Sequence, residues 1–321
     1  FVAALLLATT PPDALTALDP KGVTRYNFIA GAIGIVAALL VTATSVVMTR
    51  KHPQASGIAL AHSVPFLTAA AALRLSQSHW DTAGWAWTGL GLLIGSLAVL
   101  TLTKRYRISI AAPLVVGTVL AATGLLVRLG QLSQAGVSAI LFALMIVLLQ
   151  VAPWIALAHI PVRILDADTT EQIPAKGITD QVSTSFVFVV ALRSGGAIAA
   201  LFLTVSLMTA PDPRSVSLPL TLIMLGAVSL VLQTRSIRAR VEVLLGALTG
   251  LVVILVATVL SAYKDPRMMP WLTLAAIATA LVLVVTNVVG PRARPHLTRI
   301  ADTISVLSLF VLLPLAVYLW S

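Results

Sequence analysis

One pair of carboxylates in this sequence has the close spacing of a catalytic or metal-binding pair, Asp166 and Asp168 in the run Asp-Ala-Asp. Such a run is typical of enzymes that transfer sugars with the help of a divalent cation, because carboxylate oxygens are its preferred ligands. The competing interpretation is a solvated acidic turn beside Arg163, which needs no catalytic role. We favour the acidic turn, because no second catalytic motif accompanies the pair.

Three further polar side chains, His62, Gln150 and Asn287, lie inside apolar runs. They could line a polar site between helices, or hydrogen-bond neighbouring helices and stabilise the fold by roughly 1 kcal/mol each. His62 has no second His, Asp or Glu at the spacing of metal ligands, so no metal site is predicted. Glu242 and Asp302 stand in the first turns of predicted helices, where the helix dipole favours a carboxylate.

Familiar catalytic motifs are missing from the sequence. It contains no Gly-rich phosphate loop, no nucleophile elbow and no zinc-protease motif, and it has no cysteine. The net charge of +10 comes from basic residues at the ends of apolar runs, where membrane topology explains them better than nucleic acid does. We therefore predict no catalytic residue, metal, cofactor or nucleic-acid partner, and we do not expect an enzyme.

The elements that position these residues are expected to be membrane helices. Hydrophobic residues make up 59% of the chain and charged residues 10%, and the mean hydropathy is +1.01. Apolar runs of about 20 residues are typical of transmembrane helices. We predict an all-α, polytopic transmembrane helix bundle over residues 1–321 as a single domain, with about 11 helices, the first of them truncated at Phe1. The predicted helices are residues 1–9, 27–49, 56–73, 86–103, 108–127, 135–158, 187–208, 216–233, 241–263, 269–289 and 300–320.

Basic residues indicate how the bundle is oriented. Alternate turns contain twice as many Lys and Arg residues as the turns between them, and loops rich in these residues stay in the cytoplasm. The N-terminus is therefore predicted to be cytoplasmic and Ser321 to lie outside. The richer set consists of the turns near residues 50–51, 104–107, 163–193, 235–240 and 292–299.

The longest polar interval is the predicted cytoplasmic connector, residues 159–186. Ile178, Val182, Phe186 and Val189 recur at helical spacing, so we expect a partly amphipathic helix that continues into the next span. Four of the eleven acidic residues of the chain lie here, which predicts contact with soluble parts of partners. The predicted partner-contact residues are Arg163, Asp166, Asp168, Glu171, Lys176 and Asp180.

Two pairs of glycines have the spacing that lets membrane helices approach closely. Gly91 and Gly95 form one pair, and Gly246 and Gly250 form the other. We predict that all four pack against neighbouring helices, within one copy of the chain in preference to a seam between two copies.

The sequence resembles EccD, the polytopic membrane component of the type VII (ESX) secretion system. The resemblance covers the whole chain in topology and is strongest in three places. These are the connector entry WIALAHIPVRI with the later Pro174, the basic turn RSIRARVE, and the final run PRARPHLTRIADTISVLSLFVLLPLAVYLW. EccD proteins carry a ubiquitin-like cytoplasmic domain before the first helix, which is expected upstream and is absent from this chain.

The resemblance implies a non-enzymatic scaffold or channel-forming subunit in the inner (plasma) membrane. EccD-like proteins form a dimer around a lipid-filled space, so the implied partners include a second copy and membrane lipids. They hold together EccB-, EccC- and EccE-like subunits, EccC being the ATPase. The secreted proteins, of the ESX, PE and PPE types, are implied as indirect partners.

Two other functions remain as alternatives. A secondary transporter of an uncharged or weakly polar solute would also suit about eleven helices, and it would need a polar cavity around His62, Gln150 and Asn287. The lack of charged residues near the middle of any predicted helix weighs against proton- or ion-coupled transport. A membrane enzyme acting on a lipid-linked substrate would need the carboxylates of Asp166 and Asp168.

Overall fold

The computed structural model describes residues 20–51, 55–76, 80–102, 110–158, 175–211, 216–233, 240–268 and 294–320, together with positions 270, 273 and 277. These residues contain nine α-helices, one short 3₁₀ helix and no strand. The all-α, polytopic bundle predicted from the sequence is therefore confirmed. The predicted helix 1–9 and nearly all of 269–289 lie outside the described residues.

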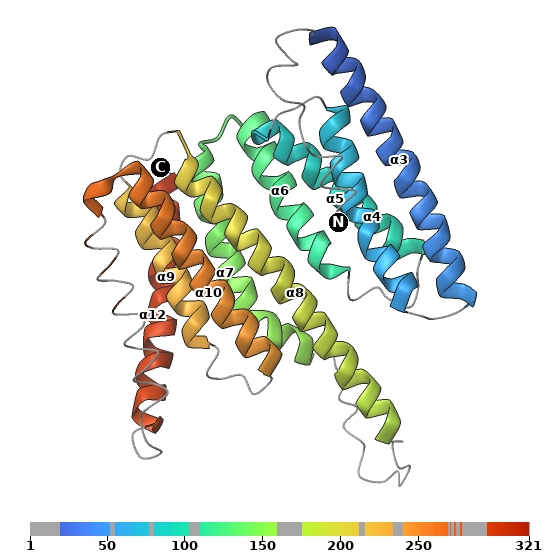
Figure 1. Cartoon of the computed structure of the whole chain (residues 1–321). Coiled ribbons are helices and arrows are strands. Elements are labelled where there is room, and N and C mark those ends of the chain that lie inside the picture. The colour runs from blue at the N-terminus through green and yellow to red at the C-terminus, as the bar shows by residue number, and fades with distance from the viewer. Residues whose placement is uncertain are drawn as a thin grey trace. The chain divides into compact units, whose positions relative to one another are not determined.

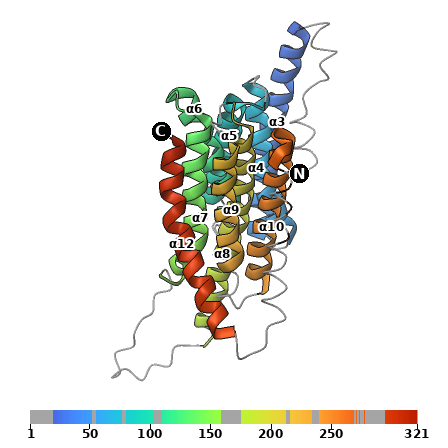
Figure 2. The same ribbon diagram turned by 90° about the vertical axis from the view of Figure 1, so that its left-hand side faces the viewer.

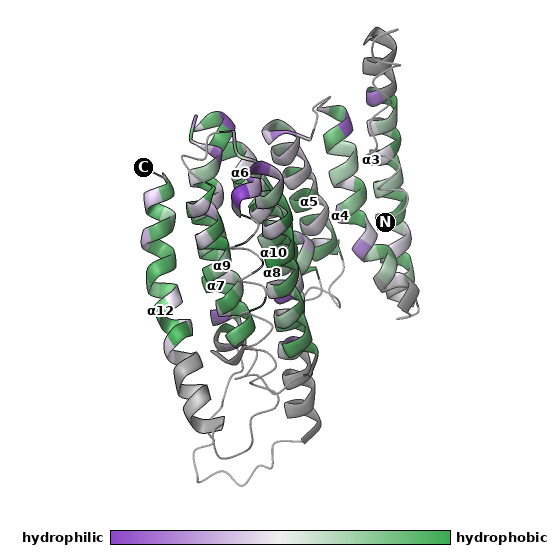
Figure 3. Ribbon diagram, turned by 60° about the vertical axis from the view of Figure 1, so that its left-hand side comes forward, coloured by the Kyte–Doolittle hydropathy of each residue, from purple (hydrophilic) through white to green (hydrophobic). Residues whose placement is uncertain are grey.

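Seven helices have spans long and apolar enough to cross a membrane, within the part of the chain that the structure describes. Backbone polar groups in a membrane must be satisfied inside the protein, and a helix does this within its own segment. Figure 3 shows the apolar residues along these helices. The spans are Asn27–Met48, Thr82–Leu102, Ala111–Leu129, Gln134–Pro153, Ser185–Thr209, Val241–Lys264 and Thr303–Trp320; Ala59–Leu75 and Ser217–Gln233 are shorter apolar helices.

The chain divides into two compact units. The first unit comprises Phe1–Leu132 and Pro153–Gly196, and the second comprises Ser133–Ala152 and Ala197–Ser321. Four helices of the first unit pack in chain order, each against the next (Figure 1). They are α3 (Pro20–Lys51), α4 (Ala55–Leu75), α5 (Thr82–Leu102) and α6 (Ala111–Leu129).

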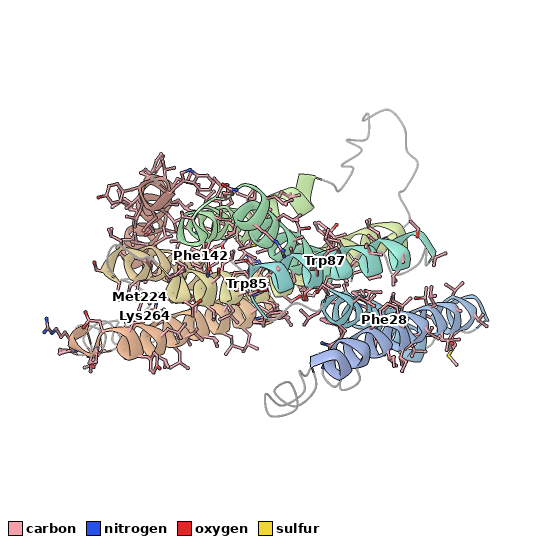
Figure 4. All side chains as sticks on the ribbon, turned by 90° about the horizontal axis from the view of Figure 1, so that it is seen from above. Phe28, Trp85, Trp87, Phe142, Met224 and Lys264 are labelled. Atoms are coloured by element: carbon pink, nitrogen blue, oxygen red, sulfur yellow. The ribbon has the colours of Figure 1, made fainter. Side chains whose placement is uncertain are left out.

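In the second unit, α9 (Ser217–Gln233) packs against α10 (Arg240–Lys264) and against α12 (Arg294–Trp320) (Figure 2). The short 3₁₀ helix η2 (Pro266–Met268) follows α10. Two helices belong to both units, α7 (Gln134–Ala158) and α8 (Ala175–Thr209). The aromatic ring of Phe142 on α7 is fully buried in the second unit, where Gly226 of α9 lies against it (Figure 4).

Local sequence explains where some helices begin. Asp81 caps α5, because its carboxylate accepts a hydrogen bond of 2.9 Å from the backbone N–H of Gly84. Ser133 caps α7 in the same way, with its hydroxyl 3.2 Å from the N–H of Gly136. Trp85, just before the predicted helix 86–103, therefore lies inside α5.

Several helices begin before their predicted starts. α3 begins at Pro20 rather than at residue 27, and α12 begins at Arg294 rather than at residue 300. Proline is favoured in a first helical turn, and the hydropathy pattern marks only the apolar part of each helix. Asp302 consequently lies well inside α12, so the prediction that it stands in the first turn is wrong. Glu242 does lie in the first turn of α10, as predicted.

Candidate functional site

The predicted connector ends in a helix that runs without a break into the membrane. α8 has 35 residues and is therefore roughly 52 Å long, whereas the hydrocarbon core of a bilayer is roughly 30 Å thick. Its apolar span starts at Ser185, so the ten residues before it extend the helix by roughly 15 Å. This segment, residues 175–184, is called the α8 extension below.

Two of the predicted partner-contact residues are on the α8 extension. Lys176 and Asp180 are one turn apart on its backbone, a separation that places them on the same side of the helix. The other four, Arg163, Asp166, Asp168 and Glu171, lie outside the described residues. The structure thus gives a rigid backbone to the end of the connector that is nearest the membrane.

The second feature is a set of hydrogen bonds between helices of the second unit, called the α7 polar seam. Near the start of α7, the hydroxyls of Ser138 and Ser206 lie 2.7 Å apart, and both side chains are fully buried. The amide of Gln134 donates to the carbonyl oxygen of Ser206 at 2.8 Å. α7 and the second half of α8 are therefore joined by side chains that find partners away from lipid.

Near the other end of α7, the seam joins α9 and α12. The side-chain amide of Gln150 donates to the buried hydroxyl of Ser229 on α9. That hydroxyl also lies 3.4 Å from the hydroxyl of Ser305 on α12. Gln150, one of the residues that sequence reasoning selected, is thus hydrogen-bonded between helices.

Gln233 completes the seam beside a proline. Its amide donates to the backbone carbonyl of Gln150 at 2.9 Å, three residues before Pro153 of α7. A proline inside a helix removes one backbone N–H donor and pushes the preceding turn open. The carbonyl that Pro153 leaves without its helical donor is that of Leu149, and Gln233 bonds the carbonyl next to it in the chain.

The chemistry of the seam is that of structural hydrogen bonding. Amides and hydroxyls supply every contact described above, and such groups do not transfer protons readily near neutral pH. The described residues contain no group of three His, Cys, Asp or Glu side chains that could hold a metal ion. His62 is half-buried on α4, and Asn287 lies outside the described residues.

Two arginines are more deeply buried than the sequence suggested. Arg74 in the last turn of α4 is 3% exposed and donates to the side-chain oxygen of Asn27 on α3 at 2.8 Å. Arg193 is 6% exposed and lies within the apolar span of α8. Charge distribution counts Arg193 with the cytoplasmic turn 163–193, but the structure surrounds its side chain with protein.

Three of the four predicted packing glycines lie against a neighbouring helix. Gly91 and Gly95 of α5 face α4, where an added Cβ would lie 2.6 Å from the carbonyl oxygen of Thr68 and 2.7 Å from the Cα of Pro65, respectively. The hydroxyl of Thr68 also donates to the carbonyl of Gly91 at 2.7 Å. Gly250 of α10 faces α9, and Gly246 is half-buried.

Sequence reasoning missed the serines of the seam. Ser138, Ser206, Ser229 and Ser305 look like the many other hydroxyl residues in apolar runs, and single-sequence patterns do not separate them. Gln134 and Gln233 carried a usable signal, because an amide at the end of an apolar run needs partners that a neighbouring helix can supply.

Comparisons with known proteins agree with this architecture. The family described as the EccD-like transmembrane domain matches residues 1–321. Protomer 1 of the ESX-3 core complex is similar in structure, with a TM-score of 0.70, 16% identity, and coverage of 97% of this chain and 76% of that chain. The MycP5-free ESX-5 inner membrane complex in State II gives a TM-score of 0.60 and 18% identity, covering 87% of this chain and 70% of that chain. No curated protein matches the sequence.

The family match covers every residue, and the solved structures show the same fold at low identity. The apolar spans together with the family match make the chain a multi-pass protein of the inner membrane. Its resemblance to the membrane component of type VII secretion systems, first seen in the connector entry, the basic turn and the final run, is thereby confirmed. The chain belongs to the EccD-like transmembrane domain family.

Proposed function

We propose that this chain is a non-enzymatic scaffold and channel-forming subunit of a type VII protein secretion complex. In this role two copies form a dimer in the inner membrane and hold an EccC-like ATPase together with EccB- and EccE-like subunits. The secreted proteins, of the ESX, PE and PPE types, contact the assembly without being chemically changed by this chain. Membrane lipids fill the space that the dimer encloses.

The α8 extension is the observation that carries this proposal. A continuous helix that leaves the membrane by roughly 15 Å gives partners a rigid handle, whereas a flexible loop would have to be ordered at an entropic cost on binding. The charged residues predicted to meet partners lie on this helix or directly before it. The similar solved chains are parts of an ESX-3 core complex and an ESX-5 inner membrane complex, which supports a role in assembly.

Charge reversal in the connector tests the docking role. Replacing Asp166 and Asp168 by Lys puts like charges opposite any cationic surface that the carboxylates meet, which costs several kcal/mol at a buried contact. The yield of the assembled complex, purified through a tag on the ATPase, should fall at least about tenfold, since about 1.4 kcal/mol corresponds to that factor. The amount of this chain in the membrane should stay unchanged.

Asp265→Lys is the matched control. Asp265 lies in the turn after α10, which charge distribution places on the opposite side of the membrane. Its carboxylate accepts a hydrogen bond of 3.1 Å from the backbone N–H of Arg267. It makes the same kind of substitution at one position, a change of charge of +2 against +4 in the double variant, and should leave the yield of the complex near normal. A normal yield from the Asp166→Lys, Asp168→Lys variant would contradict docking through the connector.

A further inference from the structure

α7 and α8 are the two described helices that run from one compact unit into the other. The first unit takes the part of α7 from Pro153 onward and the part of α8 up to Gly196. The second unit takes α7 up to Ala152 and α8 from Ala197. Any change in the arrangement of the two units must therefore bend these helices near residues 152–153 and 196–197.

In α7, the division coincides with a proline. Pro153 has no backbone N–H, so the carbonyl of Leu149 loses its usual partner within the helix, and the pyrrolidine ring crowds the same turn. Prolines are among the few established causes of sharp bends in helices. The division therefore falls at the point of α7 where the sequence weakens the helix most.

In α8, the division coincides with the run Ser194-Gly195-Gly196. Gly/Ser pairs are a second established cause of helix bending, and each glycine in a helix interior costs roughly 1 kcal/mol relative to alanine. The hydroxyl of Ser194 donates to the carbonyl of Ala191 at 2.9 Å, a bond of the kind that bends helices. Both crossing helices are thus weakened at the same division.

Contacts hold α7 before its proline and α8 at and beyond its glycine pair. In α7, the polar seam reaches Gln150 and stops three residues before Pro153. In α8, Gly195 lies against the backbone of Ala112 on α6, where an added Cβ would be 2.6 Å from the carbonyl oxygen. On the far side of the glycines, Ser206 is hydrogen-bonded to α7. Pro153 and Gly196 are the residues of the first unit next to the division, and the hydrogen bonds of Gln150 and Ser206 lie in the second unit.

We propose that Pro153 and the Gly195–Gly196 pair form a two-helix hinge, about which the two units of this chain change their arrangement. Two adjacent connections bending together leave the packing inside each unit intact, as in hinge motions of other proteins. The α8 extension belongs to the first unit. If the proposed docking role also holds, a partner that pulls on this extension moves the first unit relative to the second.

Spin labels can measure the hinge directly, because the chain has no native cysteine. Label pairs are placed at exposed residues of apolar helices, and the full chain is studied in lipid nanodiscs without partner subunits. Ile94 (63% exposed, first unit) and Leu255 (61% exposed, second unit) report across the division. Phe28 with Ile94 reports within the first unit, and Leu255 with Phe310 within the second.

The hinge predicts a distance distribution for Ile94–Leu255 at least about twice as wide as those of the two pairs inside units, since domain motions exceed motions within packed units. In the variant Pro153→Ala, Gly196→Ala the distribution should narrow to the width seen inside units. Both substitutions favour helix. If the double variant fails to fold, Pro153→Ala alone is tested in its place and should narrow the Ile94–Leu255 distance distribution partly. Pro314→Ala, a proline replacement in α12 within the second unit, should leave the distribution unchanged.

Two results would overturn the hinge. One is a wild-type Ile94–Leu255 distribution as narrow as those of the pairs inside units. The other is a broad distribution that persists in the helix-favouring variants or narrows equally in Pro314→Ala. None of these results bears on docking, because partner subunits are absent, so a failure of the hinge and a failure of the proposed function are told apart.

Discussion

A hydroxyl group inside a membrane helix has two ways to satisfy its hydrogen bond. Many of the described hydroxyls donate to a carbonyl one turn earlier in their own helix, as Thr123 does to Val119 and Ser308 does to Ile304. A smaller set bonds to another helix, as Ser45 does to the carbonyl of Gly57. Only the second kind holds helices together, so the two kinds should differ in their effect on stability.

Ser206→Ala should destabilise the chain. It removes the bond to Ser138 and leaves that buried hydroxyl without its partner, which costs about 1 kcal/mol in membrane proteins. Ser308→Ala makes the same chemical change at a side chain that is 4% exposed and bonded within its own helix, and it should change stability little. The free energy of unfolding, measured by titration with denaturing detergent in mixed micelles, compares the two variants. Equal effects would show that the Ser138–Ser206 bond contributes no stability.

At the residue scale, the sequence revealed part of the site. Gln150 was recognisable because an amide in an apolar run needs a partner, and the structure supplies one in Ser229. The serines were not recognisable, since a single sequence does not tell whether a hydroxyl bonds within its helix or across to another. Arg193 was misjudged because burial depends on neighbouring helices, which periodicity along one helix does not report.

Close helix approach is decided at the scale of elements. Gly89 of α5 faces the backbone of α6, where an added Cβ would lie 2.7 Å from the carbonyl oxygen of Gly117. Gly250 of α10 faces α9, with the added Cβ 2.5 Å from Cγ2 of Val231 and 3.0 Å from the carbonyl oxygen of Ala227. A side chain can rotate away from a new methyl group, whereas a helix backbone must shift as a whole.

Gly89→Ala and Gly250→Ala are therefore expected to differ. The first should destabilise the chain by about 1–3 kcal/mol, the usual cost of overpacking. The second should cost less than the first, because its nearest backbone atom, the carbonyl oxygen of Ala227, is 3.0 Å away and the helix gains about 1 kcal/mol in propensity. Unfolding in denaturing detergent measures both variants. A larger loss for Gly250→Ala than for Gly89→Ala would contradict the packing described for α5 and α6.

The hydropathy pattern predicted the boundaries of the membrane spans more accurately than the boundaries of the helices that contain them. The predicted helix 27–49 corresponds to the apolar span Asn27–Met48, yet α3 itself starts at Pro20. The additional turns contain charged residues, which a hydropathy pattern reads as loop although they are compatible with helix. α8 was anticipated more fully, because Ile178, Val182, Phe186 and Val189 kept helical spacing beyond the apolar span.

At the scale of the whole molecule, composition was sufficient for the fold class. A chain with 59% hydrophobic residues must place most of its side chains in lipid or against other helices. In lipid, helices satisfy the hydrogen bonds of their backbone N–H and C=O groups within their own segment. The division into two units was not foreseen, because it depends on which helices pack together over long sequence distances. The sequence contains Pro153 and the Gly195–Gly196 pair, but it does not show that both lie next to the same division between units.

The central claim is that the chain works as an assembly scaffold, and the native particle tests it most directly. The complex would be extracted from its own membranes in mild detergent, and its mass and subunit composition measured. The account predicts a particle many times the 33.6 kDa of this chain, containing at least two copies together with an ATPase and other membrane subunits. A monomer or dimer with no other subunit, recovered in full yield, would contradict the scaffold role.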